Sequence, residues 1–239
     1  MVSLIDFTKA YNSSVAVDKV NMNFEKGKIT GILGPNGAGK TTILKAICAR
    51  HFATKGKVLV NQIDAQEESE KIKKITGFVE ESAVLNSSLT VHEYLKFKAE
   101  LYKVPAEKID STIQLCSLEE VKNKKVKNLS KGYMERVNFA GALIYDPEVL
   151  ILDEPATGLD PAQIIKMRSL VKELACDKTI ILSTHLMQEA EALCDKIYIL
   201  NRGKVLAEGS IEEICKLTGC ADLEKSYFTL IENDGGSDE

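Results

Sequence analysis

A glycine-rich motif near the N-terminus constrains the fold of this chain more than any other feature. Residues 34–41 read Gly-Pro-Asn-Gly-Ala-Gly-Lys-Thr, the P-loop pattern of Gly, four residues, a second Gly, Lys and then Ser or Thr. The apolar run Ile29 to Leu33 precedes the motif, and a helical pattern with Ile43, Leu44 and Ile47 follows it. The motif cradles phosphate in this strand–loop–helix context. It therefore predicts an α/β fold in which phosphate groups lie at the start of a helix.

Each position of the motif has a chemical role. The glycines let backbone amides close on phosphate oxygens without obstruction by a side chain. Lys40 reaches the β- and γ-phosphates as a point charge, and the Thr41 hydroxyl can ligate Mg²⁺. The residues expected to bind the nucleotide here are Gly34, Pro35, Asn36, Gly37, Ala38, Gly39, Lys40, Thr41 and Thr42.

A second candidate site element is an apolar strand that ends in two acids. Residues 149–152 are apolar, and Asp153 and Glu154 follow them directly. Ligands bind at the carboxyl ends of the strands in open α/β sheets. Phosphoryl transfer needs a carboxylate for Mg²⁺ and a group that orients and deprotonates the attacking water. We assign Asp153 to the metal and Glu154 to the base; two solvated acids at a strand end would be the reading without a P-loop.

The apolar periodicity divides the rest of the chain into an α/β core and an inserted helical block. Val20, Met22 and Phe24 alternate with polar residues as in a half-buried strand, and capping signals at Thr90 and Ser130 open helices. We predict a P-loop NTPase core with a mostly parallel sheet, an N-terminal antiparallel β part and a helical subdomain. The predicted boundaries are a single domain over 1–232, its core in 1–84 and 146–209, the helical subdomain in 85–145, a short C-terminal helical part in 210–232, and a disordered acidic tail in 233–239.

Charge and composition limit the partners. The formal net charge of −4 argues against a nucleic-acid-binding surface over the whole chain, and the basic run 122–127 is expected to be a solvated loop. No apolar stretch approaches the roughly 20 residues of a membrane-spanning helix, and the N-terminus lacks the features of a signal peptide. The six cysteines form no Cys-x-x-Cys pair and are expected to be buried free thiols. We expect a cytoplasmic protein that binds no nucleic acid.

These motifs together resemble those of the ATP-binding subunits of ATP-binding cassette (ABC) transporters, over nearly the whole chain. Residues 129–132, Leu-Ser-Lys-Gly, look like the family signature and begin the helix that precedes the acidic strand. Residues 153–161 look like the acidic strand end and the following D-loop, which includes Asp160. His185, in Ser-Thr-His after the next strand, looks like the family's switch histidine. Tyr11 lies where the family stacks an aromatic ring on adenine.

The resemblance implies a magnesium-dependent ATPase that acts as a head-to-tail dimer, with itself or with a paralogous subunit. Ser130 and Gly132 of one copy would contact the γ-phosphate held by the other copy's P-loop. Asp160 would contact the opposite subunit. The implied catalytic residues are Lys40, Glu154 and His185. The resemblance also implies a separate integral membrane permease, which would hold the protein on the inner face of the cell membrane.

Two positions depart from the family pattern. Lys131 and Tyr133 stand where the signature usually has Gly and Gln, although the two positions expected to touch phosphate are kept. Glu80 and Glu81 stand where the family typically has Pro-Gln, and the Glu81 carboxylate can still reach Mg²⁺ or its water. Glu81 can equally be an exposed loop acid. These features resemble the branch that serves export permeases of the drug, sodium or polysaccharide kind.

Several alternatives stay open at this point. Ser130 can be a plain helix cap, and Tyr11 can simply pack on the surface. A soluble cassette ATPase of translation or DNA repair would carry two cassettes or a long coiled-coil insertion, which the sequence does not show. A regulatory module without turnover would not need the catalytic residues. For a transport subunit, residues 80–102 are the expected coupling surface, with exposed apolar side chains at Val84, Leu85 and Leu89.

Overall fold

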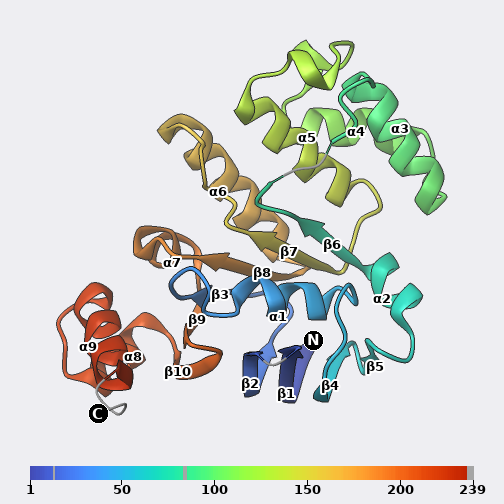
Figure 1. Cartoon of the computed structure of the whole chain (residues 1–239). Helices are drawn as coiled ribbons and strands as arrows, with labels where there is room; N and C mark the ends of the chain where they lie inside the picture. Colours follow the sequence, from blue (N-terminus) through green and yellow to red (C-terminus); the bar gives the residue numbers. More distant parts are fainter. Residues whose placement is uncertain (13, 83–84, 236–239) are drawn as a thin grey trace.

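Two sheets organise the protein, for which a computed structural model describes residues 1–12, 14–82 and 85–235. The central sheet has the strand order β10-β9-β3-β8-β7-β6, and its neighbours are parallel except in the β9–β10 hairpin (Figure 1). Its strands are β3 (Ile29–Leu33), β6 (Thr76–Val79), β7 (Val149–Asp153), β8 (Thr179–Thr184), β9 (Lys196–Asn201) and β10 (Lys204–Gly209). The second sheet is antiparallel in the order β2-β1-β4-β5, with β1 (Val2–Tyr11), β2 (Ser14–Phe24), β4 (Lys55–Val60) and β5 (Ile63–Asp64).

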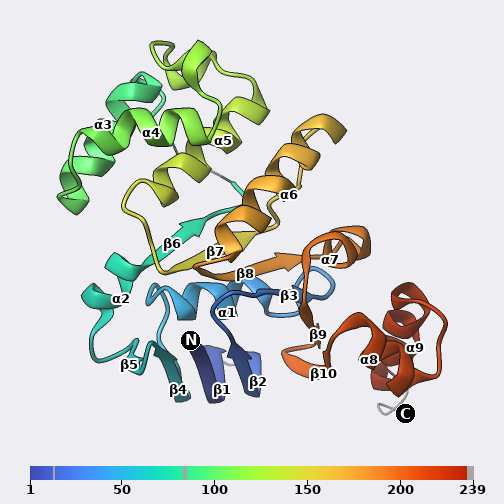
Figure 2. The ribbon, with the colours of Figure 1, turned by 180° about the vertical axis from the view of Figure 1, so that it is seen from behind.

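Helix α1 (Lys40–Ile47) lies between the two sheets, as both Figure 1 and Figure 2 show. Ile151 of β7 and Ile181 of β8 belong to the apolar cluster that contains α1 and the antiparallel sheet. Leu150 and Leu182 of the same strands face the opposite cluster, with α6 (Pro161–Ala175) and the helical block. Successive strand side chains point to opposite faces, and both faces of the sheet are covered. The continuous apolar runs of β7 and β8 follow from this arrangement.

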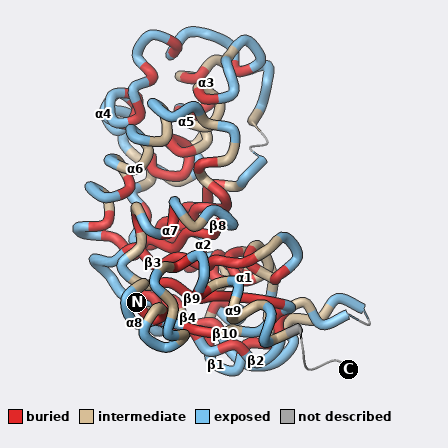
Figure 3. Tube along the Cα trace, turned by 90° about the vertical axis from the view of Figure 1, so that its left-hand side faces the viewer, coloured by how far each residue is buried: buried red, intermediate tan, exposed pale blue. Residues whose placement is uncertain are grey.

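A helical block packs beside the edge strand β6, on the face of the central sheet that α6 also covers. It contains α3 (Val91–Tyr102), α4 (Glu107–Leu115) and α5 (Lys131–Leu143), with short 3₁₀ turns at Glu119–Val121 and Val126–Asn128. The Thr90 hydroxyl accepts from the Glu93 amide, and the Glu93 carboxylate accepts from the Thr90 amide, as the capping signal predicts. Figure 3 shows buried residues inside this block as well as between the sheets, so it carries a core of its own.

The remaining helices are α2 (Ser69–Ile75), α7 (Met187–Leu193), α8 (Ile211–Thr218) and α9 (Leu223–Gly235). A capping box of Ser210 and Glu213 starts α8. Helix α9 packs against α8 and the hairpin, and Asn201 Nδ2 donates to Asp234 Oδ2 at 2.8 Å. The predicted start of a disordered tail at residue 233 is therefore wrong, because residues 233–235 continue α9. The rest of that predicted tail, 236–239, lies outside the described residues.

The predicted α/β fold, with a mostly parallel sheet, an antiparallel N-terminal part and helical segments, is confirmed. Two smaller expectations need correction. Leu85 and Leu89 are half-buried against the helical cluster instead of being exposed, while Val84 lies outside the described residues. Cys176 is exposed, so the cysteines are free but not all buried. No helix in the described part of the chain is both long enough and apolar enough to cross a membrane.

Candidate functional site

The P-loop connects β3 to α1 and needs glycine for steric reasons. Gly39 has φ of +107°, a left-handed conformation that favours glycine, and α1 begins at the next residue, Lys40. A Cβ on Gly34 would lie 2.3 Å from the Leu200 carbonyl oxygen of β9. The backbone is therefore packed closely enough that side chains cannot intervene, and the first amides of α1 face the loop.

A polar pocket lies over this loop. It encloses about 530 Å³, open to solvent, and is lined by Ala16, Pro35, Asn36, Gly37, Gly39, Lys40, Thr41, Thr42, Glu81 and Glu154. The structure thus brings most of the predicted loop residues together with the predicted base and with Glu81. Ala16 of β2 is a lining residue that the motif analysis missed, because β2 reaches this position only through the packing of the antiparallel sheet.

Lys40 is a buried residue that lines the pocket. Its side chain is 6% exposed, and Nζ donates to the carbonyl oxygens of Gly34 at 2.7 Å and Pro35 at 3.3 Å. Nζ also lies 3.2 Å from Glu154 Oε1, an ion-pair distance. That oxygen has no hydrogen-bond donor with good geometry among the described residues. A buried carboxylate oxygen in this position is available to a donor that enters the pocket, such as a water beside bound phosphate.

Thr41 and Asp153 form the candidate magnesium site. The Thr41 hydroxyl donates to Asp153 Oδ1 at 3.3 Å, and the Ser183 hydroxyl donates to the same oxygen at 2.6 Å. Mg²⁺ prefers oxygen ligands, and it binds through one or two protein groups together with waters and substrate phosphates. The described residues contain no cluster of three or more His, Cys, Asp and Glu that could hold a metal. The hydroxyl–carboxylate pair therefore fits Mg²⁺ delivered with a nucleotide, which would neutralise charge on the β- and γ-phosphate oxygens.

Glu154 is fixed by both its backbone and its side chain. Its φ is +50°, and its amide donates to the Ser183 carbonyl at 3.2 Å and lies 3.1 Å from the Ser183 hydroxyl oxygen. His185 Nδ1 lies 2.8 Å from Glu154 Oε2, and the His185 amide donates to the same oxygen at 3.3 Å. The carboxylate thus has one oxygen on His185 and the other toward Lys40 and the loop. In this position Glu154 can orient a water at the phosphates and accept its proton.

Ser183 is the second residue that the motif analysis missed as a site residue. It lies on β8 two positions before His185, which directly follows the strand, and side chains of a strand repeat every second residue on one face. That spacing was the available signal. The neighbour it supports, Asp153, lies directly across from it on β7.

The predicted signature and D-loop residues lie apart from the P-loop pocket. Ser130 caps α5 by accepting from the Tyr133 amide at 3.4 Å, and Asp160 caps α6 by accepting from the Gln163 amide at 2.9 Å. The Gln163 side chain fills the space beside Gly132, where a Cβ would lie 2.3 Å from Gln163 Nε2. The structure therefore brings Ser130, Gly132 and Asp160 toward one another and not to the pocket that their own chain forms.

Tyr11 is likewise not among the residues that line the P-loop pocket. Its hydroxyl lies 2.6 Å from His51 Nδ1, and the two rings meet edge to face. Burial lowers the pKa of His51, with smaller contributions from the positive charges of Lys45 and Lys9. The role of Tyr11 in stacking on adenine stays a prediction.

Residues 17–157 match the protein family described as ABC transporter. The Nod factor export ATP-binding protein I of Rhizobium leguminosarum bv. viciae is 37% identical over 231 residues, covering 93% of this chain and 74% of that protein. The ABC transporter ATP-binding protein NatA of Bacillus subtilis (strain 168) is 32% identical over 242 residues, and the alignment covers 97% of this chain and 98% of that protein.

Solved structures of ATP-binding cassettes are also similar to this chain. An ATP-binding subunit of an ABC transporter has a TM-score of 0.90 and 27% identity to this chain, covering 97% of it and 99% of that chain. A dimeric, post-hydrolysis ATP-binding cassette bound to ADP and Pi has a TM-score of 0.79 and 30% identity, covering 88% and 98%. Since the family match spans more than half of the chain and relatives align along nearly all of it, the protein belongs to the ABC transporter family, as an ATP-binding subunit that hydrolyses ATP with Mg²⁺.

Proposed function

We propose that the ATPase site is completed by a second subunit, paired head to tail. The observation that carries this proposal is the separation of Ser130 and Gly132 from the pocket of their own P-loop. Ser130 is exposed at the start of α5, where the helix presents free amides and the positive end of its dipole. These groups suit a γ-phosphate held by another copy. Dimeric cassettes among the solved relatives support the arrangement.

In this dimer each residue has a distinct role. The P-loop, Lys40 and Thr41 hold the triphosphate, Asp153 and Glu81 face the magnesium side, and Glu154 is the base. His185 fixes Glu154 and approaches the γ-phosphate. Asp160, at the start of α6, contacts the opposite copy.

The ATPase powers export through a separate membrane permease, and the protein lies on the inner face of the cell membrane. The export direction is supported by the Nod factor export relatives, which are 34–37% identical to this chain. The separate permease is supported by a related cassette, 29% identical, that is part of the cbiONQ transporter complex. The coupling surface runs over residues 80–102, where Phe97 and Leu101 of α3 are exposed apolar side chains.

The dimer is tested with Glu154→Gln, which keeps the size of the side chain and removes its ability to take a proton. We expect turnover to fall about 10²- to 10⁴-fold, the usual contribution of a general base. ATP should then hold the variant as a dimer, measured by size-exclusion chromatography with light scattering. The double variant Lys40→Ala/Glu154→Gln is the control and should stay monomeric. A Glu154→Gln variant that stays monomeric under saturating ATP would contradict the proposal.

The membrane partner is tested by recovering proteins bound to tagged Glu154→Gln from detergent-solubilised membranes. An integral membrane protein recovered with ATP, and not with the Lys40→Ala control, supports the transport role. Recovery of ribosomes or DNA instead would favour the soluble cassette ATPases of translation or repair.

A further inference from the structure

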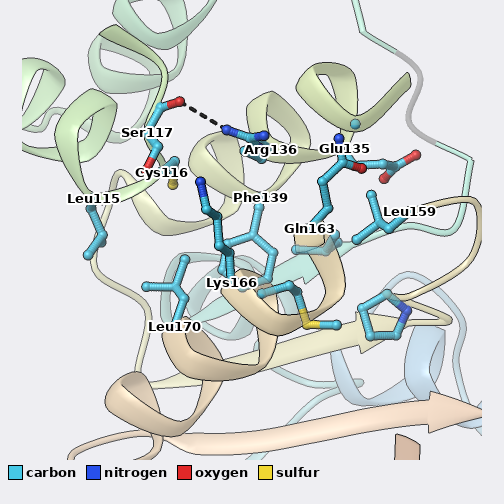
Figure 4. A pocket seen from close by; sticks show the side chains of 14 residues that line it. Leu115, Cys116, Ser117, Glu135, Arg136, Phe139, Leu159, Gln163, Lys166 and Leu170 are labelled. Carbon is cyan, nitrogen blue, oxygen red and sulfur yellow. Dashed lines mark hydrogen bonds between the residues drawn. The ribbon is translucent and has the colours of Figure 1, made fainter. Parts of the chain in front are cut away.

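A cleft that shares no lining residue with the P-loop pocket lies between α4, α5 and α6. Figure 4 shows it from close by, with side chains from all three helices around it. It encloses about 630 Å³ of space, open to solvent. Its apolar wall is formed by Val79, Phe139, Pro155, Leu159, Met167 and Leu170. We call it the α4–α6 cleft.

Two cations border this cleft without an acidic partner. Arg136 of α5 donates from Nη1 to the Ser117 carbonyl at 3.2 Å, and its guanidinium lies 4.7 Å from the centre of the Tyr133 ring. In Figure 4 the Lys166 ammonium of α6 points toward the same end of the cleft as Arg136 and Ser117. Within residues 1–12, 14–82 and 85–235, no carboxylate lies within 4.0 Å of either cation. Like charges beside an apolar wall create a local attraction for an anion.

Glu135, an acidic residue that lines the cleft, lies away from these two cations. Figure 4 shows Glu135 on the far side of Gln163 from Lys166, toward Leu159. Burial raises the pKa of Glu135; the nearby Lys131 charge opposes this rise and the Glu81 charge adds to it. Glu135 therefore does not neutralise the cationic end, and a negative group there meets two positive side chains.

The apolar surface continues beyond the cleft. A neighbouring pocket shares Leu115 with it and is lined by Leu143, Ile144 and Leu174. Leu170 and Leu174 are four residues apart on α6, so their side chains are neighbours on one face of the helix. Leu115 lies between the two pockets and is 41% exposed. An extended apolar chain that starts at Arg136 and Lys166 therefore has a continuous surface to cover.

We propose that the α4–α6 cleft binds a single-chain amphipathic carboxylate of the medium-chain fatty acid type. The carboxylate pairs with Arg136 and Lys166, and the chain lies along Leu115 and Leu170. Gly132 and Pro155 are also part of the wall. The ligand packs between α5 and α6, and the signature residue Gly132 and the residue that follows Glu154 belong to the wall of the same cleft, so its binding alters the rate of ATP hydrolysis.

Decanoate is the probe, used with the full chain, without nucleotide and below its micelle concentration. Isothermal titration should show saturable binding of one decanoate per chain. Lys166→Gln and the double variant Arg136→Gln/Lys166→Gln should weaken binding, the latter about tenfold or more, since charge-assisted hydrogen bonds are lost. Lys172→Gln, an exposed lysine on the same helix, is the matched control and should bind as the wild type does. Lys166→Gln leaves the Arg136 contacts intact, so it remains informative if the double variant unfolds.

The chain length and the charge of the probe give independent checks. Octanoate, two methylenes shorter, should bind about 15-fold more weakly, because each buried methylene contributes about fourfold in affinity. Decanol should bind more weakly than decanoate and be indifferent to the charge variants. Lys40→Ala should keep its decanoate affinity, which separates this site from the nucleotide site.

Three outcomes would overturn the proposal: no saturable binding, equal binding of decanol and decanoate, or charge variants that bind decanoate normally. The effect on turnover is measured separately. Saturating decanoate should change kcat at least about twofold in the wild type and leave it unchanged in Lys166→Gln at the same concentration. An unchanged wild-type kcat with decanoate bound would remove the regulatory part of the proposal.

Discussion

Glu154 combines a left-handed backbone with hydrogen bonds to Ser183 and His185. A φ of +50° is uncommon for a residue with a side chain, and such conformations persist where the surroundings hold them. Here the Glu154 amide hydrogen-bonds to Ser183, and one Glu154 carboxylate oxygen lies 2.8 Å from His185 Nδ1. The position of the base therefore depends on β8 as much as on the strand that carries it.

Ser183 also orients the carboxylate of Asp153. Its hydroxyl donates to Asp153 Oδ1 at 2.6 Å, so Ser183→Ala leaves that carboxylate less firmly oriented. Partners of metal ligands typically contribute 10- to 100-fold to metal affinity, and we expect the Mg²⁺ concentration for half-maximal ATPase activity to rise by about that factor. The measurement is a Mg²⁺ titration of turnover at fixed ATP. Ser169→Ala, an exposed serine on α6, is the control. An unchanged Mg²⁺ requirement in Ser183→Ala would contradict this account of the site.

At the residue scale, the sequence motifs predicted which side chains converge. Lys40, Thr41, Asp153 and Glu154 lie together as the motifs indicated, and His185 joins them as the family resemblance implied. Sequence reasoning missed the supporting contacts, because these depend on which strands are neighbours. The pairing of β7 with β8 brings residues 30 apart in sequence into contact, and no local pattern encodes it.

At the element scale, helix starts were predictable and their packing was not. The two predicted caps, Thr90 and Ser130, accept the expected hydrogen bond, and Asp160 and Ser210 cap α6 and α8 in the same way. Caps are local, because the side chain bonds an amide three residues away. The cleft between α4, α5 and α6 arises from how separately capped helices pack, which the periodicity alone does not specify.

Two substitutions of Asp160 distinguish its structural role as a helix cap from its proposed contact with the opposite subunit. Asp160→Ala removes the cap of α6 and should lower the free energy of unfolding by about 1 kcal/mol, while Asp160→Asn caps almost as well. Urea unfolding measures both. If the carboxylate also contacts a second copy, Asp160→Asn should reduce ATP turnover while keeping wild-type stability. Wild-type turnover in Asp160→Asn would limit this residue to capping.

The Asp146–Lys178 pair connects the segment before β7 to the start of β8. Lys178 is buried, and its Nζ lies 2.5 Å from Asp146 Oδ1. The hydrogen bond from Lys178 holds the pKa of Asp146 below its ordinary value of 3.8, against an opposing effect of burial. Because the folded pKa is the lower one, the pair stabilises the fold above about pH 4, and this contribution is lost as pH falls through the folded pKa.

Asp146→Asn should therefore lower the free energy of unfolding by about 1–2 kcal/mol at pH 7, the range for a charge-assisted hydrogen bond with an exposed partner. The difference from the wild type should be the same at pH 7 and pH 5 and shrink only below about pH 4. Urea unfolding across this range is the measurement. Asp177→Asn is the control, since Asp177 is 4.0 Å from the same ammonium. A difference that shrinks already between pH 7 and pH 5 would contradict the assignment.

At the scale of the whole molecule, a head-to-tail dimer can be tested by mixing two inactive variants. Lys40→Ala removes the P-loop function, and Gly132→Asp places charge and bulk beside Gln163 at the signature. Each variant alone should be nearly inactive. A mixture should recover roughly a quarter of wild-type turnover, because half of randomly paired dimers are mixed and each mixed dimer keeps one intact composite site. A mixture as inactive as its components would argue against composite sites, provided that both variants melt like the wild type.

The order of strands in the central sheet also affects how the protein is made. The strand that precedes the phosphate loop, β3, has β8 and β9 as its neighbours, and Ile29 pairs with Ile180, 151 residues later (180 − 29). At roughly 5–20 residues per second, a ribosome needs roughly 8 to 30 s to synthesise that interval. During this time β3 has no sheet partner, and its apolar residues are exposed to other chains. A nascent polypeptide that stalls within α6 therefore has every residue of the loop but lacks β8 and β9, the two strands that flank β3 in the folded sheet.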